Sequence, residues 1–109
     1  MNTENQNNSS AQMREIVINT CYGGFGLSEK AKKIYCEKMK IDYVKFDDYR
    51  LSRTDTLLVE IIKELGAEAN DFYANLEIVS LPVGTKYRIC EYDGLENIET
   101  IESIRWKIA

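Results

Sequence analysis

The chain contains no histidine, and it has only three cysteines among its 109 residues. Without histidine, the commonest general base and metal ligand is absent, together with every nucleophile that an imidazole activates. The cysteines, Cys21, Cys36 and Cys90, form no C-x-x-C pair and lack a set of companion ligands, so neither a metal site nor thiol catalysis is expected. An enzyme built from this chain would have to use carboxylates, lysine, tyrosine or cysteine.

The sequence also lacks a long apolar run and an excess of positive charge. No segment approaches the roughly 20 apolar residues of a membrane span, and the polar N-terminal segment is not expected to act as a secretion signal. A net charge of −4 disfavours binding to DNA or RNA polymers, although a small anionic ligand needs only two or three well-placed cations. Unpaired thiols in an odd number favour a reducing compartment, so we expect a cytoplasmic protein without a membrane partner.

Hydrophobic patterning predicts one α+β domain. Residues 1–13 are rich in Asn, Gln and Ser and are predicted to be a disordered tail, and residues 14–109 form a single ligand-binding domain. We expect a small mixed or antiparallel sheet with two principal helices. The helices are predicted at 29–39, capped by Ser28, and after the S-x-x-D capping box 52–55, ending at Gly66.

Strands are predicted where β-branched and apolar residues gather between turn residues. The segments are 14–20, which is expected to be covered on both faces, 42–46, 76–81, 86–92 and the closing run 103–108, which contains Trp106. The link 82–85 is interpreted as a hairpin or close connection, and residues 93–102 as a turn or a short helix.

The segment NTCYGGFGLSEK, residues 19–30, places three glycines between a strand and a helix. The bare backbone of Gly23, Gly24 and Gly26 is able to approach a phosphate or carboxylate near the positive end of a helix. Phe25 lies within this loop, either as a ligand contact or as an apolar plug into the core. The pattern is neither a dinucleotide fingerprint nor a Walker motif, so a plain turn is the alternative.

Two further groups of residues are suited to a nucleotide. Arginine offers a planar fork for phosphate oxygens, and each arginine has a solvated surface charge as its alternative. The chain has Arg14, Arg50, Arg53, Arg88 and Arg105, of which Arg53 lies beside a helix N-terminus and Arg88 and Arg105 lie on predicted strand faces. The segment NDFYAN combines amides and aromatic rings, and Asn70, Phe72 and Asn75 are the candidates for contacts with a base or ribose. Its alternative is a polar turn with Phe72 in the core.

Several of these segments resemble a known phage family. The segments are VINTCYGGFGLS, RTDTLLVEIIKELGAEAN, LEIVSLPVGTKYRICEYDGLENI and the closing Arg-Trp, with the glycine segment and EYDG the most distinctive. Together they resemble the phage Thoeris anti-defence sponge proteins, which counter bacterial TIR-domain immunity. The resemblance covers nearly all of the chain after residue 13.

The resemblance implies a non-enzymatic protein without a cofactor. Such sponges bind cyclic ADP-ribose isomers, among them glycocyclic ADP-ribose, and keep the intact signal from its effector in the bacterial cytoplasm. It also implies a homodimer or higher homo-oligomer with pockets across subunit interfaces and, in some members, a second site for cyclic oligonucleotides. In this chain it implies adenine stacking by Phe72, with Asn70 and Asn75 near the base or ribose. It also implies that the phosphate candidates are Arg53, Arg88 and Arg105.

Two other classes of function stay open on the sequence. An enzyme that degrades the nucleotide signal would need a paired base or a metal cluster, and the adjacent Asp47 and Asp48 are the nearest approach to one. A protein-interaction inhibitor of a host defence enzyme would show an exposed aromatic patch without a concave pocket.

Overall fold

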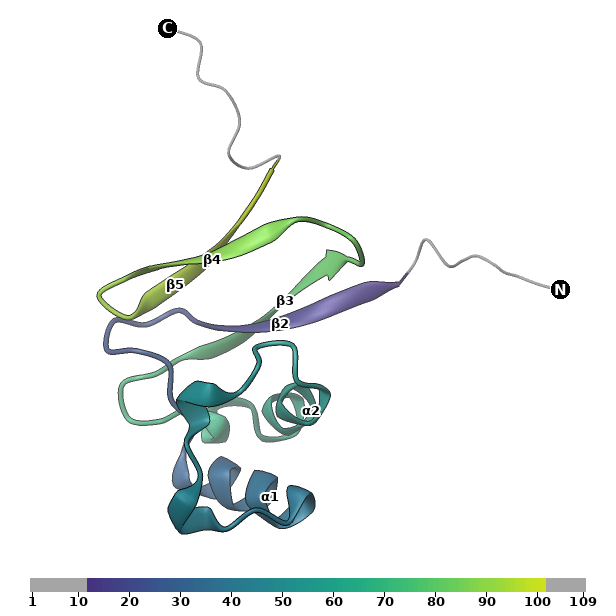
Figure 1. The fold of residues 1–109 in the computed structure, drawn as a ribbon. Helices are drawn as coiled ribbons and strands as arrows, with labels where there is room; N and C mark the ends of the chain where they lie inside the picture. Colours follow the sequence, from purple (N-terminus) through teal and green to yellow (C-terminus); the bar gives the residue numbers. More distant parts are fainter. Residues whose placement is uncertain (1–11, 102–109) are drawn as a thin grey trace, which may run out of the picture.

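The computed structural model of the chain describes residues 12–101, which form the predicted α+β fold. Two α-helices accompany two antiparallel sheets of two strands each, rather than one sheet. Figure 1 shows both helices on one side of the first sheet and the second sheet, a hairpin, on its other side. The predicted strand 103–108, with Arg105 and Trp106, lies outside the described residues.

The first sheet joins β2 (Met13–Asn19) to β3 (Leu76–Pro82), with Met13 opposite Pro82 and Asn19 opposite Leu76. Ile16, Val17 and Ile18 are all buried, which confirms a strand covered on both faces. Val17 packs in the core with the helices, and alternation along the strand turns its two neighbours to the opposite face. Met13 begins this strand and therefore does not belong to the predicted tail.

Helix α1 (Glu29–Met39) has the predicted bounds, and the Ser28 hydroxyl accepts a 3.1 Å hydrogen bond from the amide of Ala31. Helix α2 (Thr56–Leu65) buries Leu58, Val59, Ile61 and Ile62 against the core and ends at Gly66, as predicted. A short 3₁₀ helix, η4 (Gly66–Ala69), follows it. The apolar stripe of α2 thus determines which face meets the sheet.

Helix α2 begins directly after the predicted capping box 52–55, but its cap is the last residue of that box. Asp55, rather than Ser52, is the N-cap, because its Oδ1 accepts the amide of Leu58 at 3.0 Å. The hydroxyl of Ser52 instead accepts the amide of Thr54 in a local turn. The second oxygen of Asp55 accepts a 2.6 Å hydrogen bond from the hydroxyl of Tyr35, which ties the start of α2 to α1.

The predicted strand 42–46 is wrong. The structure has two 3₁₀ helices there, η2 (Tyr43–Lys45) and η3 (Asp48–Arg50). Asp42 and Asp47 each accept an amide two residues ahead with a side-chain oxygen, and this local bonding competes with a strand.

The second sheet pairs β4 (Tyr87–Tyr92) with β5 (Leu95–Thr100). The turn predicted within 93–102 is confined to Asp93 and Gly94, which at φ 51° and 89° close a tight hairpin between two strands. The short helix is wrong, because β5 follows this turn directly. The link 82–85 is a close connection from one sheet to the other and does not pair β3 with β4.

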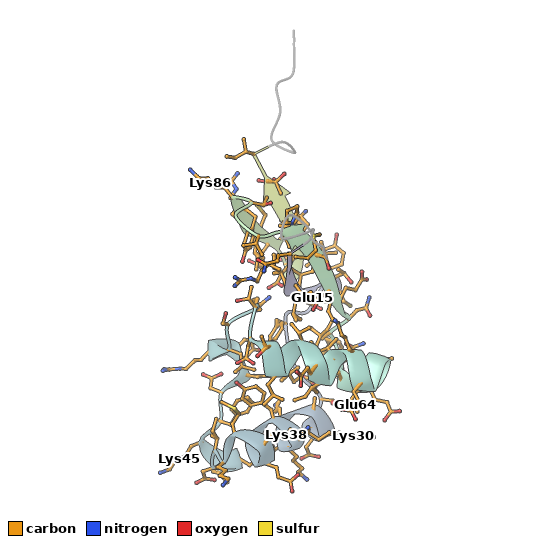
Figure 2. All side chains as sticks on the ribbon, turned by 90° about the vertical axis from the view of Figure 1, so that its right-hand side faces the viewer. Glu15, Lys30, Lys38, Lys45, Glu64 and Lys86 are labelled. Carbon is orange, nitrogen blue, oxygen red and sulfur yellow. The ribbon has the colours of Figure 1, made fainter. Side chains whose placement is uncertain are left out.

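Charged side chains lie mostly on the outside of this fold. Figure 2 shows Lys45 on the helical part and Lys86, which directly precedes β4, both pointing outward. Lys63 on α2 reaches Glu15 on β2 at 2.6 Å, and both side chains are partly exposed. Such surface pairs contribute little to the stability of the fold.

Candidate functional site

The glycine turn of the sequence meets the hairpin turn between β4 and β5. Gly23 and Gly24 have φ of 122° and 105°, and the amide of Gly23 donates a 3.1 Å hydrogen bond to the carbonyl of Asp93. A Cβ atom on Gly94 would stand 2.3 Å from the amide nitrogen of Gly24, so the two turns touch through backbone alone. Glycine is therefore required at this contact for close approach as well as for backbone conformation.

Asn19, the last residue of β2, connects the two turns. Its side chain is fully buried, and its amide donates 2.7 Å hydrogen bonds to the carbonyls of Cys21 and Gly94. Its side-chain oxygen accepts the amide of Asn75 at 2.8 Å. One side chain therefore fixes the glycine turn, the hairpin turn and the loop before β3 relative to one another.

Glu96 on β5 carries a buried negative charge beside this junction. It is 7% exposed, and it accepts the backbone amide of Asn19 at 2.9 Å. Both of its oxygens accept from the guanidinium of Arg53, with Nη2 at 2.9 Å from Oε2. The guanidinium carbon also lies 3.9 Å from the centre of the Phe25 ring, so Arg53 is held by a carboxylate at its edge and an aromatic ring at one face.

A groove of about 500 Å³ opens above these residues, between the glycine turn and the hairpin. It is lined by Gly24, Phe25, Tyr49, Arg53, Ile89, Glu91, Gly94 and Glu96. A more open hollow of about 590 Å³ adjoins it and shares Gly24, Glu91 and Gly94. In the described part of the chain, Arg53 is the one cation that lines either space, against several carboxylates.

The structure divides the predicted glycine residues between two roles. Gly24 lines the groove, and Gly23 lines the adjoining hollow. Gly26 is buried, and a Cβ there would lie 2.9 Å from a carboxylate oxygen of Asp71, so this glycine serves packing against the 70–75 loop. Phe25 is 3% exposed and belongs to the hydrophobic core, which confirms the expectation of an apolar plug. It also lines the groove, and its contact with a ligand stays a prediction.

Asn70 and Asn75 hold their own loop in place. The side-chain oxygen of Asn70 accepts the amide of Leu76 at 2.8 Å. The side-chain amide of Asn75 donates to the hydroxyl of Thr20 at 2.9 Å, and its carbonyl accepts the amide of Thr20. The side chains of both residues therefore have hydrogen-bond partners within the fold, and neither lines the groove.

Phe72 lies on the surface and is 85% exposed, so the alternative that placed it in the core is wrong. Its ring meets that of Tyr73 edge to face, with centroids 4.9 Å apart, and Tyr73 is itself 65% exposed. The Cβ of Tyr73 would lie 2.6 Å from a Cβ on Gly23, so this aromatic pair adjoins the glycine turn. We call Phe72 and Tyr73 the aromatic pair.

Arg88 lies apart from the groove. On β4 it sits opposite Glu99, which accepts its Nε at 3.0 Å and its Nη2 at 2.8 Å. This hydrogen bonding raises the pKa of the arginine and lowers that of the carboxyl. The adjacent Ile89 lines the groove, so strand alternation turns Arg88 to the other face. The structure thus brings Phe25 and Arg53 together and leaves Arg88 elsewhere, while Arg105 lies outside the described residues.

Sequence reasoning missed Asn19, Glu91 and Glu96. Asn19 ends a continuous apolar strand, which signals a buried polar residue, and Asp93-Gly94 is a strong hairpin signal that would have placed Glu91 and Glu96 on paired strands. Tyr49 was likewise missed, since nothing in its polar segment marks it as a groove residue.

The described residues offer little for metal or thiol chemistry. Between residues 12 and 101, no cluster of three or more Cys, Asp and Glu side chains is arranged to hold a metal ion. Burial raises the pKa of the Cys36 thiol, and a hydrogen bond with Glu99 raises that of Cys90. Asp48 is buried and accepts the amide of Leu27 at 2.9 Å, which gives it a structural role.

No family model, curated protein or solved structure matches this chain. Within residues 12–101, neither helix has the length and apolar character to cross a membrane.

Proposed function

We propose that this protein is a non-enzymatic sponge that binds an intact cyclic ADP-ribose isomer, glycocyclic ADP-ribose, and withholds it from the effector of bacterial TIR immunity. The observation that carries this proposal is the contact between the two turns. The glycine segment and EYDG are the most distinctive segments of the resemblance, and they lie against each other and line one groove.

The chemistry of the groove supports a ligand with a base and sugars. Phe25, Ile89 and Tyr49 offer apolar and aromatic surface, whereas the exposed carboxylate of Glu91 is an acceptor for hydroxyl or amino groups. The junction around Asn19 is buried and fully bonded, so the walls of the groove are preorganised. Preorganised walls favour affinity because binding then costs little ordering of the protein.

Within residues 12–101, the groove of a single chain is open and Arg53, the one cation that lines it, is already paired with a carboxylate. A pyrophosphate therefore needs further cations, and a second copy of the chain is the source we propose. The exposed aromatic pair beside the glycine turn offers an apolar surface for that copy. We accordingly expect a homodimer or higher homo-oligomer in the host cytoplasm, with the pocket completed between subunits.

The aromatic pair also favours a second candidate, a protein-interaction inhibitor of a host defence enzyme. Two adjacent rings at 85% and 65% exposure form the kind of surface that binds a protein partner. In that case the groove would hold no nucleotide, and the aromatic pair would carry the affinity.

Calorimetric titration of the purified protein with glycocyclic ADP-ribose tests the proposal. We expect a dissociation constant in the nanomolar range, about −12 kcal/mol, because a sponge must outcompete an effector. Heating the complex should then release the ligand chemically unchanged. An absence of binding heat, with capture of a host defence enzyme instead, would support the inhibitor. Release of a hydrolysed nucleotide would identify an enzyme.

A further inference from the structure

The guanidinium of Arg53 is held in a way that leaves one surface for a ligand. Its Nη edge is bonded to both oxygens of Glu96, and one face lies 3.9 Å from the ring centre of Phe25. The side chain is nevertheless 22% exposed, and it lines the groove. The exposed part of this side chain therefore faces the groove, while Glu96 occupies its Nη edge and Phe25 lies against one face.

The charges around Arg53 argue against a phosphate at this position. The carboxylate of Glu96 neutralises the guanidinium, and Glu91 places a second carboxylate in the same groove. Among the described residues that line the groove, there is no further cation to offset them. An incoming phosphate would meet repulsion from two carboxylates that a single paired arginine does not outweigh.

A flat, uncharged ring would not be repelled by these two carboxylates. Guanidinium planes stack on bases, and such stacking depends on area and planarity more than on net charge. Ile89 and the 72% exposed Tyr49 add apolar surface around the same space, and Glu91 is an acceptor for an amino or hydroxyl group.

We infer that the groove takes a planar heteroaromatic base stacked on Arg53, so that the residue predicted to hold phosphate is instead a base platform positioned by Phe25 and Glu96. This inference rests on the proposed function, since it assigns one part of the proposed ligand to one part of the site. The phosphates of that ligand must then lie outside the groove of the single chain.

The test compares two probes on the unmodified, ¹⁵N-labelled full chain: adenosine, which is uncharged, and inorganic pyrophosphate. We expect adenosine to shift the amides of Gly24 and Gly94 and the Nε–H of Arg53 in a saturable manner. Its affinity should stay the same when salt rises from about 0.05 to about 0.5 M, because no ion pair is formed. Saturable shifts with pyrophosphate that salt abolishes, and none with adenosine, would overturn the inference.

A matched pair of variants tests whether the flat surface of the Arg53 guanidinium contributes to binding. Arg53→Lys keeps the charge that faces Glu96 but removes the flat surface, and it should weaken adenosine binding about tenfold. Arg88→Lys makes the same change in the Arg88–Glu99 pair outside the groove and should leave the affinity unaltered. Equal affinities for both folded variants would contradict a base platform. The comparison of adenosine with pyrophosphate needs no variant, so it tests the inference even where Arg53→Lys fails to fold.

Titration with glycocyclic ADP-ribose separates this inference from the proposed function. Binding of adenosine at Arg53 without binding of the cyclic nucleotide would support the platform and contradict the sponge. Binding of the cyclic nucleotide together with pyrophosphate, but not adenosine, would support the sponge and contradict the platform.

Discussion

Gly94 approaches Gly24 so closely that a Cβ atom on Gly94 would stand 2.3 Å from the amide nitrogen of Gly24. These two residues are far apart in the sequence, yet they close the same end of the groove. The fold brings them together because Asn19 and Glu96 bond the end of β2 to the β4–β5 hairpin. The shape of the groove therefore depends on a contact that admits no side chain.

Gly94→Ala should lower the melting temperature by more than an alanine at positive φ would alone, because its Cβ atom also clashes with the glycine turn. Gly84 is a matched control, since its φ of 96° resembles the 89° of Gly94 while the space around its Cβ is open. An alanine at positive φ costs about 1 to 2 kcal/mol in either place, and the clash at Gly94 adds about 1 to 3 kcal/mol. Equal thermal denaturation of Gly84→Ala and Gly94→Ala would show that the two turns do not touch.

Glu96→Ala should destabilise the fold by about 3 to 5 kcal/mol, because it leaves the half-buried Arg53 without its counter-charge. Glu99→Ala removes a carboxylate from an exposed pair with Arg88 and should cost at most about 1 kcal/mol. Urea denaturation of both variants measures the difference. A similar small loss for both would mean that the Arg53–Glu96 pair is not buried in solution.

Stability should fall at alkaline pH because of Tyr35. Burial, with a hydrogen bond to Asp55 as the second cause, raises the pKa of Tyr35 from 10.0 to about 12. The unfolded chain thus loses this proton at lower pH than the folded chain, so stability is complete below pH 10 and declines between pH 10 and 12. The contribution is about 2 to 3 kcal/mol.

The measurement is urea denaturation at a series of pH values, with Tyr35→Phe as the control. The variant lacks the titrating hydroxyl, so its stability should change less across the same window. Parallel curves for the two proteins would show that Tyr35 is not responsible.

Phe72→Ala should leave the stability of the folded chain within about 0.5 kcal/mol, since the side chain is 85% exposed. If a second copy covers the aromatic pair, the variant should associate more weakly, and light scattering would report a lower average mass. Val44→Ala, another change at an exposed apolar residue, is the control because Val44 lies in η2, away from the pair. An unchanged mass for Phe72→Ala would remove this surface from the proposed subunit contact.

The sequence predicted the elements that carry strong local signals. The apolar run of β2, the Ser28 cap of α1 and the apolar stripe of α2 each have one dominant cause, and the structure confirms them. The prediction of a strand at 42–46 was wrong because aspartates on both sides bond the nearby backbone. Val44 is also 88% exposed, so a strand would not be stabilised by burial of this side chain.

The candidate site was harder to predict because its geometry depends on long-range contacts. The glycine turn was recognised, but its partner turn at Asp93-Gly94 was not placed, and so Glu91 and Glu96 were missed. Arg53 was identified as a candidate for phosphate binding, whereas its pairing with Glu96, which lies 43 positions away in the chain, changes what it is able to hold. Local patterns predict which residues form a turn, and tertiary pairing decides what charge remains available there.

The most direct test of the ligand site is an amide map of the ¹⁵N-labelled protein during titration with glycocyclic ADP-ribose. The account predicts saturable shifts at Gly24, Phe25 and Gly94, with the amide of Gly84 unmoved, because the ligand enters the groove between the two turns. A spectrum that stays unchanged in excess ligand, or shifts confined to the turn that contains Gly84, would contradict it.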